Sequence, residues 1–450
     1  MKHLHILLSF ALTSACTSEA VAPTAPLAIS TASLPEATPQ IPYNYALEAT
    51  GGAGAYTWSI VEGALPDGLT LGTSSGTITG IPTGGSSTFS LQVRSKDGQA
   101  AEAALNLKVA VLLQSVSAGL EFSCGVATSG VAYCWGSNQS GKLGDGTTSN
   151  SNVPVVVSGG LTFTSVSAGG NSTCGVTISG AAYCWGNNAF GQLGNGTNAS
   201  SSVPVPVSGG LAFQMVSTGE YHSCGVTPTG AAYCWGQNDF GGLGDSSTTH
   251  SNVPVLVSGG FTFRSVSAGG GASCGVTTAD IAYCWGDNYY GVLGNDIFDR
   301  SLLPMPVSGG LTFEEVSTDV HQSCGLTTEG SAYCWGFLAG STVPTLVSGG
   351  STFQTLSSDK YHACAITTTG ASYCWGWSTG GALGNGTNTD SEAPVPVSGG
   401  HHFAFISAGA THTCAVTTTQ AAYCWGDNVY GGLGNGTHTD ADVPVLVAFP

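Results

Sequence analysis

The chain has 450 residues, of which 68 are glycine and only 8% are charged. Coiled coils and long surface helices depend on Lys, Glu and Arg, so this composition excludes them and favours many short strands joined by glycine-rich turns. Eight basic against 26 acidic residues give a formal net charge of −18, so we expect no nucleic-acid partner and no attraction to anionic membrane surfaces.

Residues 1–15 have the features of an export signal. Lys2 precedes a short apolar stretch at residues 6–12, and small residues follow it. The segment Leu12-Thr13-Ser14-Ala15-Cys16 resembles the lipobox of bacterial lipoproteins, although Thr13 stands where that motif prefers Leu. The resemblance implies that Cys16 becomes the lipidated first residue. Cleavage by an ordinary signal peptidase is the alternative, and both routes export the mature chain.

The spacing of the cysteines predicts a series of disulfides. Apart from Cys16, the other fourteen Cys form seven pairs whose members lie ten positions apart. Paired zinc ligands are usually separated by about two to four residues, so this spacing suits zinc poorly, whereas disulfides are common in exported proteins. The predicted disulfides are Cys124–Cys134, Cys174–Cys184, Cys224–Cys234, Cys274–Cys284, Cys324–Cys334, Cys364–Cys374 and Cys414–Cys424.

A tether at residues 16–26 precedes a cysteine-free unit at residues 27–110. Its strand signals, at residues 43–47, 56–60, 89–93 and 104–109, are separated by turn residues and predict a sandwich of antiparallel strands. The stretch Leu-Pro-Asp-Gly-Leu at 65–69, followed by Ser-Gly-Thr-Ile-Thr-Gly-Ile-Pro at 75–82, resembles the immunoglobulin-like domains of bacterial surface proteins. The resemblance implies a spacer or an adhesion module.

From residue 111 onward the sequence repeats. Measured on the second Cys of each pair, the steps are 50, 50, 50, 50, 40 and 50 residues. The fifth repeat is short because it lacks the ten-residue loop Asn-x-x-Gly-x-Leu-Gly that follows Trp-Gly elsewhere. The seven repeats are 111–160, 161–210, 211–260, 261–310, 311–350, 351–400 and 401–450.

Each repeat predicts four strands, in the second repeat at residues 163–168, 174–177, 181–185 and 203–207. The middle two form a hairpin whose turn needs a positive φ, and glycine supplies it at 130, 180, 230, 330 and 370. Asp280 tolerates that conformation, whereas Gln420 is unexplained there. Because side chains alternate faces along a strand, Cys184 faces one neighbouring blade while Tyr183 and Trp185 face the other. We expect these Trp to be core.

The repeated Val-Ser-Ala-Gly, Ser-Cys-Gly-Val-Thr, Tyr-Cys-Trp-Gly and Asn-x-x-Gly-x-Leu-Gly segments resemble the regulator of chromosome condensation repeat, whose members are seven-bladed propellers. The predicted fold is therefore all-β, a seven-bladed β-propeller preceded by a small immunoglobulin-like β-sandwich. Well-known members promote nucleotide exchange on a small nuclear GTPase and bind chromatin. We do not expect that activity in an exported chain without a basic surface. Secreted propellers that inhibit β-lactamases are the nearer analogue.

The chain direction separates the two faces of the predicted propeller. The turns before the first Cys and the loops after Trp-Gly lie on one face, which we call the upper face, and they vary between repeats. Their aromatic residues suit a protein-binding surface. Those just before Gly, such as Phe190 and Tyr430, alternatively pack onto the next blade, whereas Tyr221, Tyr361 and Trp377 are expected to be exposed. The predicted surface comprises Phe122, Phe190, Tyr221, Phe240, Tyr289, Tyr290, Tyr361, Trp377 and Tyr430.

Catalytic chemistry finds little support. His222, His362 and His412 share one repeat position, so structural hydrogen bonds explain them better than general-base roles. No nucleophile elbow, metal-binding histidine pair or phosphate-binding loop is present in the sequence. We therefore predict no enzyme activity, no catalytic residue, no metal and no cofactor. The expected function is protein binding by an exported propeller of the bacterial cell envelope, or a secreted one. An enzyme inhibitor, an adhesin and a carbohydrate-binding protein are the alternatives.

Overall fold

The computed structural model describes residues 24–83 and 85–449, which divide into two compact units between Ala110 and Val111. The predicted export signal and Cys16 lie outside the described residues. The described part of the chain contains strands and two short 3-10 segments but no α-helix. This confirms the all-β prediction of seven four-stranded blades after an N-terminal β-sandwich.

The N-terminal unit packs three small antiparallel sheets around one core. Trp58, Phe89, Leu91 and Val93 are buried there. Gly76 explains part of the family motif: its φ is +67°, and a Cβ at this position would lie 2.5 Å from the Trp58 indole nitrogen. The sheets, in strand order, are β1 (Ala28–Ile29) with β3 (Ala49–Thr50); β2 (Tyr43–Ala46), β6 (Thr77–Gly80) and β5 (Leu69–Leu71); and β4 (Tyr56–Gly63), β7 (Ser87–Ser95) and β8 (Ala100–Leu107).

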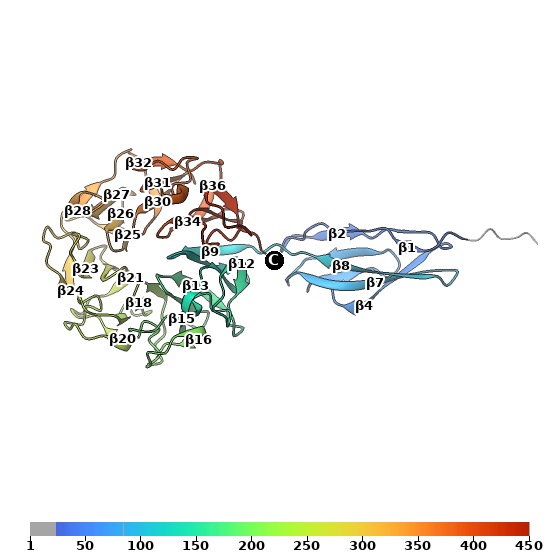
Figure 1. Ribbon diagram of the computed structural model, residues 1–450, viewed down its shortest axis with the longest axis horizontal. Helices are drawn as coiled ribbons and strands as arrows, with labels where there is room; N and C mark the ends of the chain where they lie inside the picture. The colour runs from blue at the N-terminus through green and yellow to red at the C-terminus, as the bar shows by residue number, and fades with distance from the viewer. Residues whose placement is uncertain (1–23, 84, 450) are drawn as a thin grey trace, which may run out of the picture. The chain divides into compact units, whose positions relative to one another are not determined.

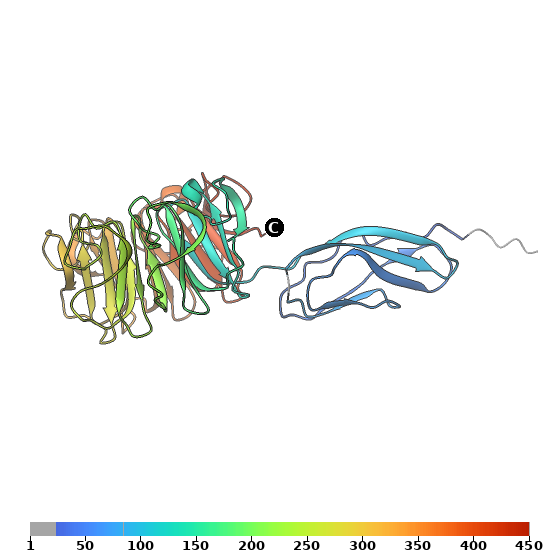
Figure 2. The same cartoon turned by 90° about the horizontal axis from the view of Figure 1, so that it is seen from below.

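The second unit is a ring of seven antiparallel four-stranded blades, each built from one repeat (Figure 1). Seen from the side, the strands run between the two faces of the ring (Figure 2). The first strand of each blade lines the central channel and the fourth is outermost. The strands of blades one to three, from the axis outward, are β9 (Leu113–Ala118), β10 (Phe122–Ala127), β11 (Ala132–Gly136) and β12 (Ser151–Val156); β13 (Phe163–Ala168), β14 (Ser172–Thr177), β15 (Ala182–Gly186) and β16 (Ser201–Pro206); β17 (Met215–Thr218), β18 (His222–Val226), β19 (Ala232–Gly236) and β20 (Ser251–Leu256).

Blades four to seven have the same order, and 3-10 segments begin the upper loops of blades one and six, η1 (Gln139–Gly141) and η2 (Thr379–Gly381). In blade five the third and fourth strands are joined directly by residues 337–340. The strands are β21 (Phe263–Ala268), β22 (Ala272–Thr277), β23 (Ala282–Gly286) and β24 (Ser301–Pro306); β25 (Phe313–Thr318), β26 (Gln322–Thr327), β27 (Ala332–Gly336) and β28 (Ser341–Leu346); β29 (Phe353–Ser358), β30 (His362–Thr367), β31 (Ser372–Gly376) and β32 (Ser391–Pro396); β33 (Phe403–Ala408), β34 (His412–Thr417), β35 (Ala422–Gly426) and β36 (Ala441–Leu446).

A serine on each innermost strand links the blades around the axis. The Ala168 N–H donates to Ser117 Oγ of the preceding blade at 2.9 Å, and Thr218 N–H donates likewise to Ser167 Oγ. The ring closes with the same contact, because Ala118 N–H of blade one donates to the Ser407 Oγ of blade seven at 3.0 Å. The first and last repeats therefore meet without exchanging a strand.

The contacts between blades follow the predicted alternation of faces. Trp185 is fully buried against Cys124 and Cys134 of blade one, while the Cys174–Cys184 disulfide of its own blade packs against Trp235 of blade three. In each blade the paired Cys are directly opposite on neighbouring strands, and all seven predicted disulfides are present. Each disulfide therefore lies in the core between two blades, beneath the indole of the next blade.

All seven hairpin turns have the positive φ that the sequence predicts. The values are 81° to 85° at the glycines, 63° at Asp280 and 68° at Gln420. A residue with a side chain in this left-handed conformation lowers the free energy of unfolding by about 1–2 kcal/mol. Glycine avoids this strain, but its greater conformational freedom in the unfolded chain offsets part of the gain.

We expect Gln420→Gly to raise the free energy of unfolding by about 0.5–1 kcal/mol, measured by urea denaturation. Gly370→Gln, at the same position of blade six, is the matched control and should lower it by a similar amount. A loss of stability in Gln420→Gly would contradict the argument.

Candidate interaction surface

Aromatic residues from three consecutive blades meet on the upper face. Tyr290 of blade four contacts His321 and Phe337 of blade five, with ring centroids 4.8 and 5.7 Å apart. His321 stacks on Tyr361 of blade six at 5.5 Å, and Tyr361 stacks on Trp377 at 5.1 Å with parallel planes. Together with Tyr289, whose ring lies 4.9 Å from Tyr290, these residues form the aromatic surface.

Much of the aromatic surface is open to solvent. The exposed fractions are 74% for Tyr289, 59% for Phe337 and 43% for Trp377, whereas Tyr290 and Tyr361 are half-buried beside them. The sequence prediction missed Phe337. Its position directly after Trp-Gly, in the one repeat without the following loop, was the available signal. A continuous set of rings, three of them exposed, supplies the large, rigid contact area found at protein interfaces.

A pocket of about 220 Å³ lies beside the aromatic surface. Tyr289, Tyr290 and Phe240 contribute apolar walls, while Glu220, Asp287 and Asp319 contribute carboxylates, so blades three to five share it; its other lining residues are Tyr221, Gln237, Gly270, Gly271, Ala272, Val292 and Val320. Asp287 Oδ1 accepts the Tyr289 N–H at 3.1 Å, which fixes the start of the loop that carries both tyrosines. Rings next to carboxylates give this part of the upper face the chemistry to receive a basic side chain.

The remaining predicted aromatic residues have different environments. Phe240 is 44% exposed. Phe190 packs against Tyr221 of the next blade at 5.7 Å, which supports the packing alternative for that residue. Tyr221 and Tyr361 are half-buried, so their predicted exposure was wrong, and Tyr430 is half-buried as well.

Phe122 is also a correction, because it is completely buried. It is the first residue of β10, the position that His222 occupies in β18, and its side chain points between blades. The Lys142 ammonium lies 4.7 Å from the centre of its ring and covers it. Phe122 is therefore core and does not belong to a binding surface.

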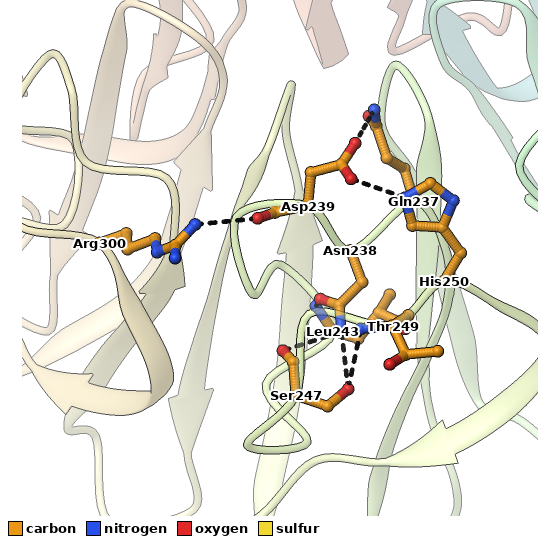
Figure 3. Close-up of polar contacts among 8 residues, drawn as sticks. All are labelled: Gln237, Asn238, Asp239, Leu243, Ser247, Thr249, His250 and Arg300. Carbon is orange, nitrogen blue, oxygen red and sulfur yellow. Dashed lines mark hydrogen bonds and ion pairs between the residues drawn. The ribbon is translucent and has the colours of Figure 1, made fainter.

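Five of the six upper loops are held in shape by a buried asparagine, and in blade six Ser378 takes its place. In blade three, Asn238 Oδ1 accepts the Leu243 N–H at 2.9 Å, and Asn238 Nδ2 donates to the carbonyls of Ser247 and Thr249 (Figure 3). Asp239 on the loop accepts hydrogen bonds from His250 and, with a smaller effect, from Gln237, and these hold its pKa below the ordinary value. The loops are thus rigid platforms for the side chains that they present.

Charged residues gather where the central channel meets the upper face. The Lys360 ammonium pairs with the Glu220 carboxylate of blade three, across the ring. Asp319 and Asp359 replace, in blades five and six, the glycine found at this position elsewhere. Burial, and then the negative charge of Asp319, raise the pKa of Asp359 well above its ordinary value. One Lys among these three acids leaves the mouth of the channel acidic.

The three predicted structural histidines are completely buried between blades. Ser273 Oγ donates to the Gly242 carbonyl at 2.9 Å, so at 2.7 Å it accepts from the His222 Nε2–H. His362 and Thr413, and His412 and Ser123, form the same pairs. Burial lowers the pKa of His222 to about 4, of His362 to about 3 and of His412 to about 4. These contacts confirm the structural role.

The described residues contain neither a candidate metal cluster nor a candidate membrane-spanning helix. No cluster of three or more His, Cys, Asp or Glu side chains in residues 24–83 and 85–449 has the arrangement of a metal site. Over the same part of the chain, no helix is long and apolar enough to cross a membrane.

Comparison with known protein families identifies the repeats and the N-terminal unit. A model of the regulator of chromosome condensation (RCC1) repeat matches residues 129–176, 179–226, 229–276, 369–416 and 421–450, and a second RCC1 model matches 114–142, 163–192, 216–241, 263–292 and 403–431. The chain belongs to the RCC1-repeat family. Neither RCC1 model matches residues 293–368, although β25 to β28 there form an RCC1-type blade without its upper loop. The family described as "Putative Ig domain" matches residues 25–110.

Solved RCC1-type propellers share the fold. Human WBSCR16 is 21% identical, with a TM-score of 0.64 over 70% of this chain and 90% of its own. Prp20p from Saccharomyces cerevisiae, whose structure is described with its binding to Gsp1p and histones, is 18% identical, with a TM-score of 0.64 over 75% of this chain and 87% of its own. At these identities the likeness shows the fold alone. No curated protein matches the chain.

Proposed function

We propose that this RCC1-repeat chain is an exported binding protein whose aromatic surface engages a protein partner bearing a basic patch. The observation that carries the proposal is the continuous set of rings from Tyr289 to Trp377 beside an acidic pocket. Tyr and Trp supply most of the binding energy at many protein interfaces. The formal charge of −18 favours encounter with a positively charged partner.

The disulfides and the N-terminal sequence support the proposed export. Seven disulfides are typical of a chain that folds in an oxidising compartment. We propose that lipidation of Cys16 anchors the chain to the bacterial envelope and that the immunoglobulin-like unit serves as a spacer. Mass spectrometry of the mature N-terminus tests this: a diacylated Cys16 is expected, and an unmodified terminus would contradict it.

Photo-crosslinking from the aromatic surface tests the binding function. A benzoylphenylalanine at position 289 should yield a crosslinked extracellular or envelope protein, whereas one at position 178, in the exposed lower hairpin turn, should not. Replacing Tyr289, Phe337 and Trp377 together by Ala should weaken binding of that partner at least tenfold, because two or three buried rings dominate such an interface. Binding is measured by calorimetry on chains with seven intact disulfides.

The control variant replaces Ile178, Leu256 and Leu446, which are 72%, 55% and 56% exposed and lie away from the aromatic surface. It removes as many exposed apolar side chains and should bind the partner normally. Equal losses in both variants, or none in the first, would overturn the proposal. Binding of glycans in place of any protein would favour the carbohydrate-binding alternative.

A further inference from the structure

In six blades the upper loop completes the core of the next blade. Its Leu is fully buried, as Leu193 of blade two is, and the carbonyl just before that Leu accepts the indole N–H of the next blade's Trp. The Trp235 N–H donates to the Gln192 carbonyl at 2.9 Å. The equivalent bonds, between 2.7 and 3.0 Å, are Trp135 to Gly432, Trp185 to Lys142, Trp285 to Gly242, Trp335 to Val292 and Trp425 to Ala382.

The same loop makes two further contacts with the next blade. The Gly196 N–H donates to the Asn252 carbonyl on the outermost strand at 2.8 Å. Gly194, which follows the buried Leu, lies flat on the indole of Trp235, where a Cβ would come within 2.8 Å of the ring. The loop therefore combines an aliphatic side chain, a carbonyl, an N–H and a glycine in one fixed arrangement.

Blade five has no such loop, and a pocket of about 620 Å³ lies between blades five and six. Its lining includes Trp375, Trp377, Phe337, Leu346 and Val347. Among the described residues, nothing from blade five takes the place of the loop carbonyl or the loop N–H. The Trp375 indole and the Glu392 carbonyl consequently lack the bonds that their equivalents make in the other six blades.

Blade six also differs at the residue that would contact the missing loop. Ser or Thr occupies this position in the other blades and donates to the loop carbonyl, as Ser223 does to Gln192 at 3.1 Å. In blade six the residue is the buried Ala363. A hydroxyl there would be a buried donor without an acceptor. The Trp375 indole N–H is thus the donor that keeps, in blade six, the position from which the other blades bind the loop carbonyl.

We propose that this pocket binds a loop of a partner protein that carries an aliphatic residue followed by glycine and takes the place of the missing loop. The six intact blades show what this surface accepts: a buried Leu, a carbonyl for the indole, an N–H for the outer strand and a glycine against the ring. Asp390 and Glu392 at the rim favour a basic residue in the partner. The inference rests on the proposed function and names the kind of segment that the partner inserts.

A cyclic peptide of residues 186–201 is the direct probe. It contains the loop of blade two, and its ends are cross-strand neighbours, because Gly186 pairs with Ser201, so head-to-tail closure keeps the loop conformation. By calorimetry with the full chain we expect one site per propeller. The Leu193→Ala peptide should bind at least tenfold more weakly.

The protein control is a loop graft. Replacing residues 338–340 of blade five by residues 188–200 of blade two fills the pocket from within the chain and keeps Phe337 of the aromatic surface. This variant should bind neither peptide. Absence of saturable binding to the natural chain, equal binding of the two peptides, or binding to the grafted chain would each overturn the proposal. A partner that still binds the grafted chain, but not the Tyr289/Phe337/Trp377 variant, would overturn the pocket and leave the proposed function intact.

Discussion

Reduction of the disulfides is expected to abolish the cooperatively folded propeller at 37 °C. Each bridge closes a hairpin of sequence separation 10, which corresponds to about 3 kcal/mol of stabilisation by loop closure. A folded domain is stable by only about 5–15 kcal/mol in total, so the loss of seven bridges exceeds what the ring can tolerate. Thermal unfolding followed by circular dichroism, with and without reductant, measures the effect.

The chain contains its own control for this experiment. Residues 27–110 hold no Cys, so hydrogen exchange at β4 and β7 should remain protected under reducing conditions while the blades lose protection. A milder variant, Cys174→Ser with Cys184→Ser, should lower the free energy of unfolding of the propeller by about 3 kcal/mol. A reduced chain that unfolds at the same temperature as the oxidised one would contradict the prediction.

Acid is expected to destabilise the propeller through three histidines. The unfolded imidazole has a pKa near 6.5, whereas the folded values for His222, His362 and His412 are about 4, 3 and 4. The stability that the neutral rings provide is present above pH 6.5 and is lost as the pH falls toward the folded pKa values. Each of these pKa shifts corresponds to a loss of about 3 kcal/mol or more in the free energy of unfolding once the ring is protonated, because protonation places an unpaired charge between two blades.

The triple variant His222→Gln, His362→Gln and His412→Gln should therefore show a much shallower loss of stability between pH 6.5 and 4, measured by urea denaturation. Glutamine is the matched substitute, because Gln322 occupies this position in blade five and donates to the Asp359 carbonyl at 3.0 Å. His250→Gln is the control, since His250 is partly exposed on an upper loop. This substitution should leave the loss of stability between pH 6.5 and 4 unchanged. If the triple variant loses as much stability between pH 6.5 and 4 as the natural chain, other groups drive acid unfolding.

Much of the blade design follows from the sequence of one repeat. Alternation along the Ala-Tyr-Cys-Trp strand placed the disulfide and the indole on opposite faces, and the structure has this arrangement in every blade. The positive φ at the hairpin turn followed from glycine at that position, and Asp280 and Gln420 adopt it too. These features depend on residues within about ten positions of one another, where backbone geometry alone determines the outcome.

The candidate site depends on contacts that no single repeat contains. Phe122 and Phe337 are both aromatic residues of the upper segments, yet the first is buried under Lys142 and the second is 59% exposed. Their environments differ because a loop covers one and is missing from beside the other. The repeats, compared with one another, show that blade five lacks the loop. They do not indicate that the Trp375 indole of the following blade therefore lacks a hydrogen-bond acceptor.

The sequence by itself determined the all-β class, the seven blades, the disulfides and the two faces, because these follow from period and alternation along a short stretch of chain. Only the tertiary structure decided which aromatic side chains remain exposed and where the pocket lies. Exposure is set by the neighbouring blade, whose contacting residues are about forty positions away, as Trp235 is from Gln192. The space left between two such blades depends on how they pack in the ring, and local sequence patterns do not contain that information.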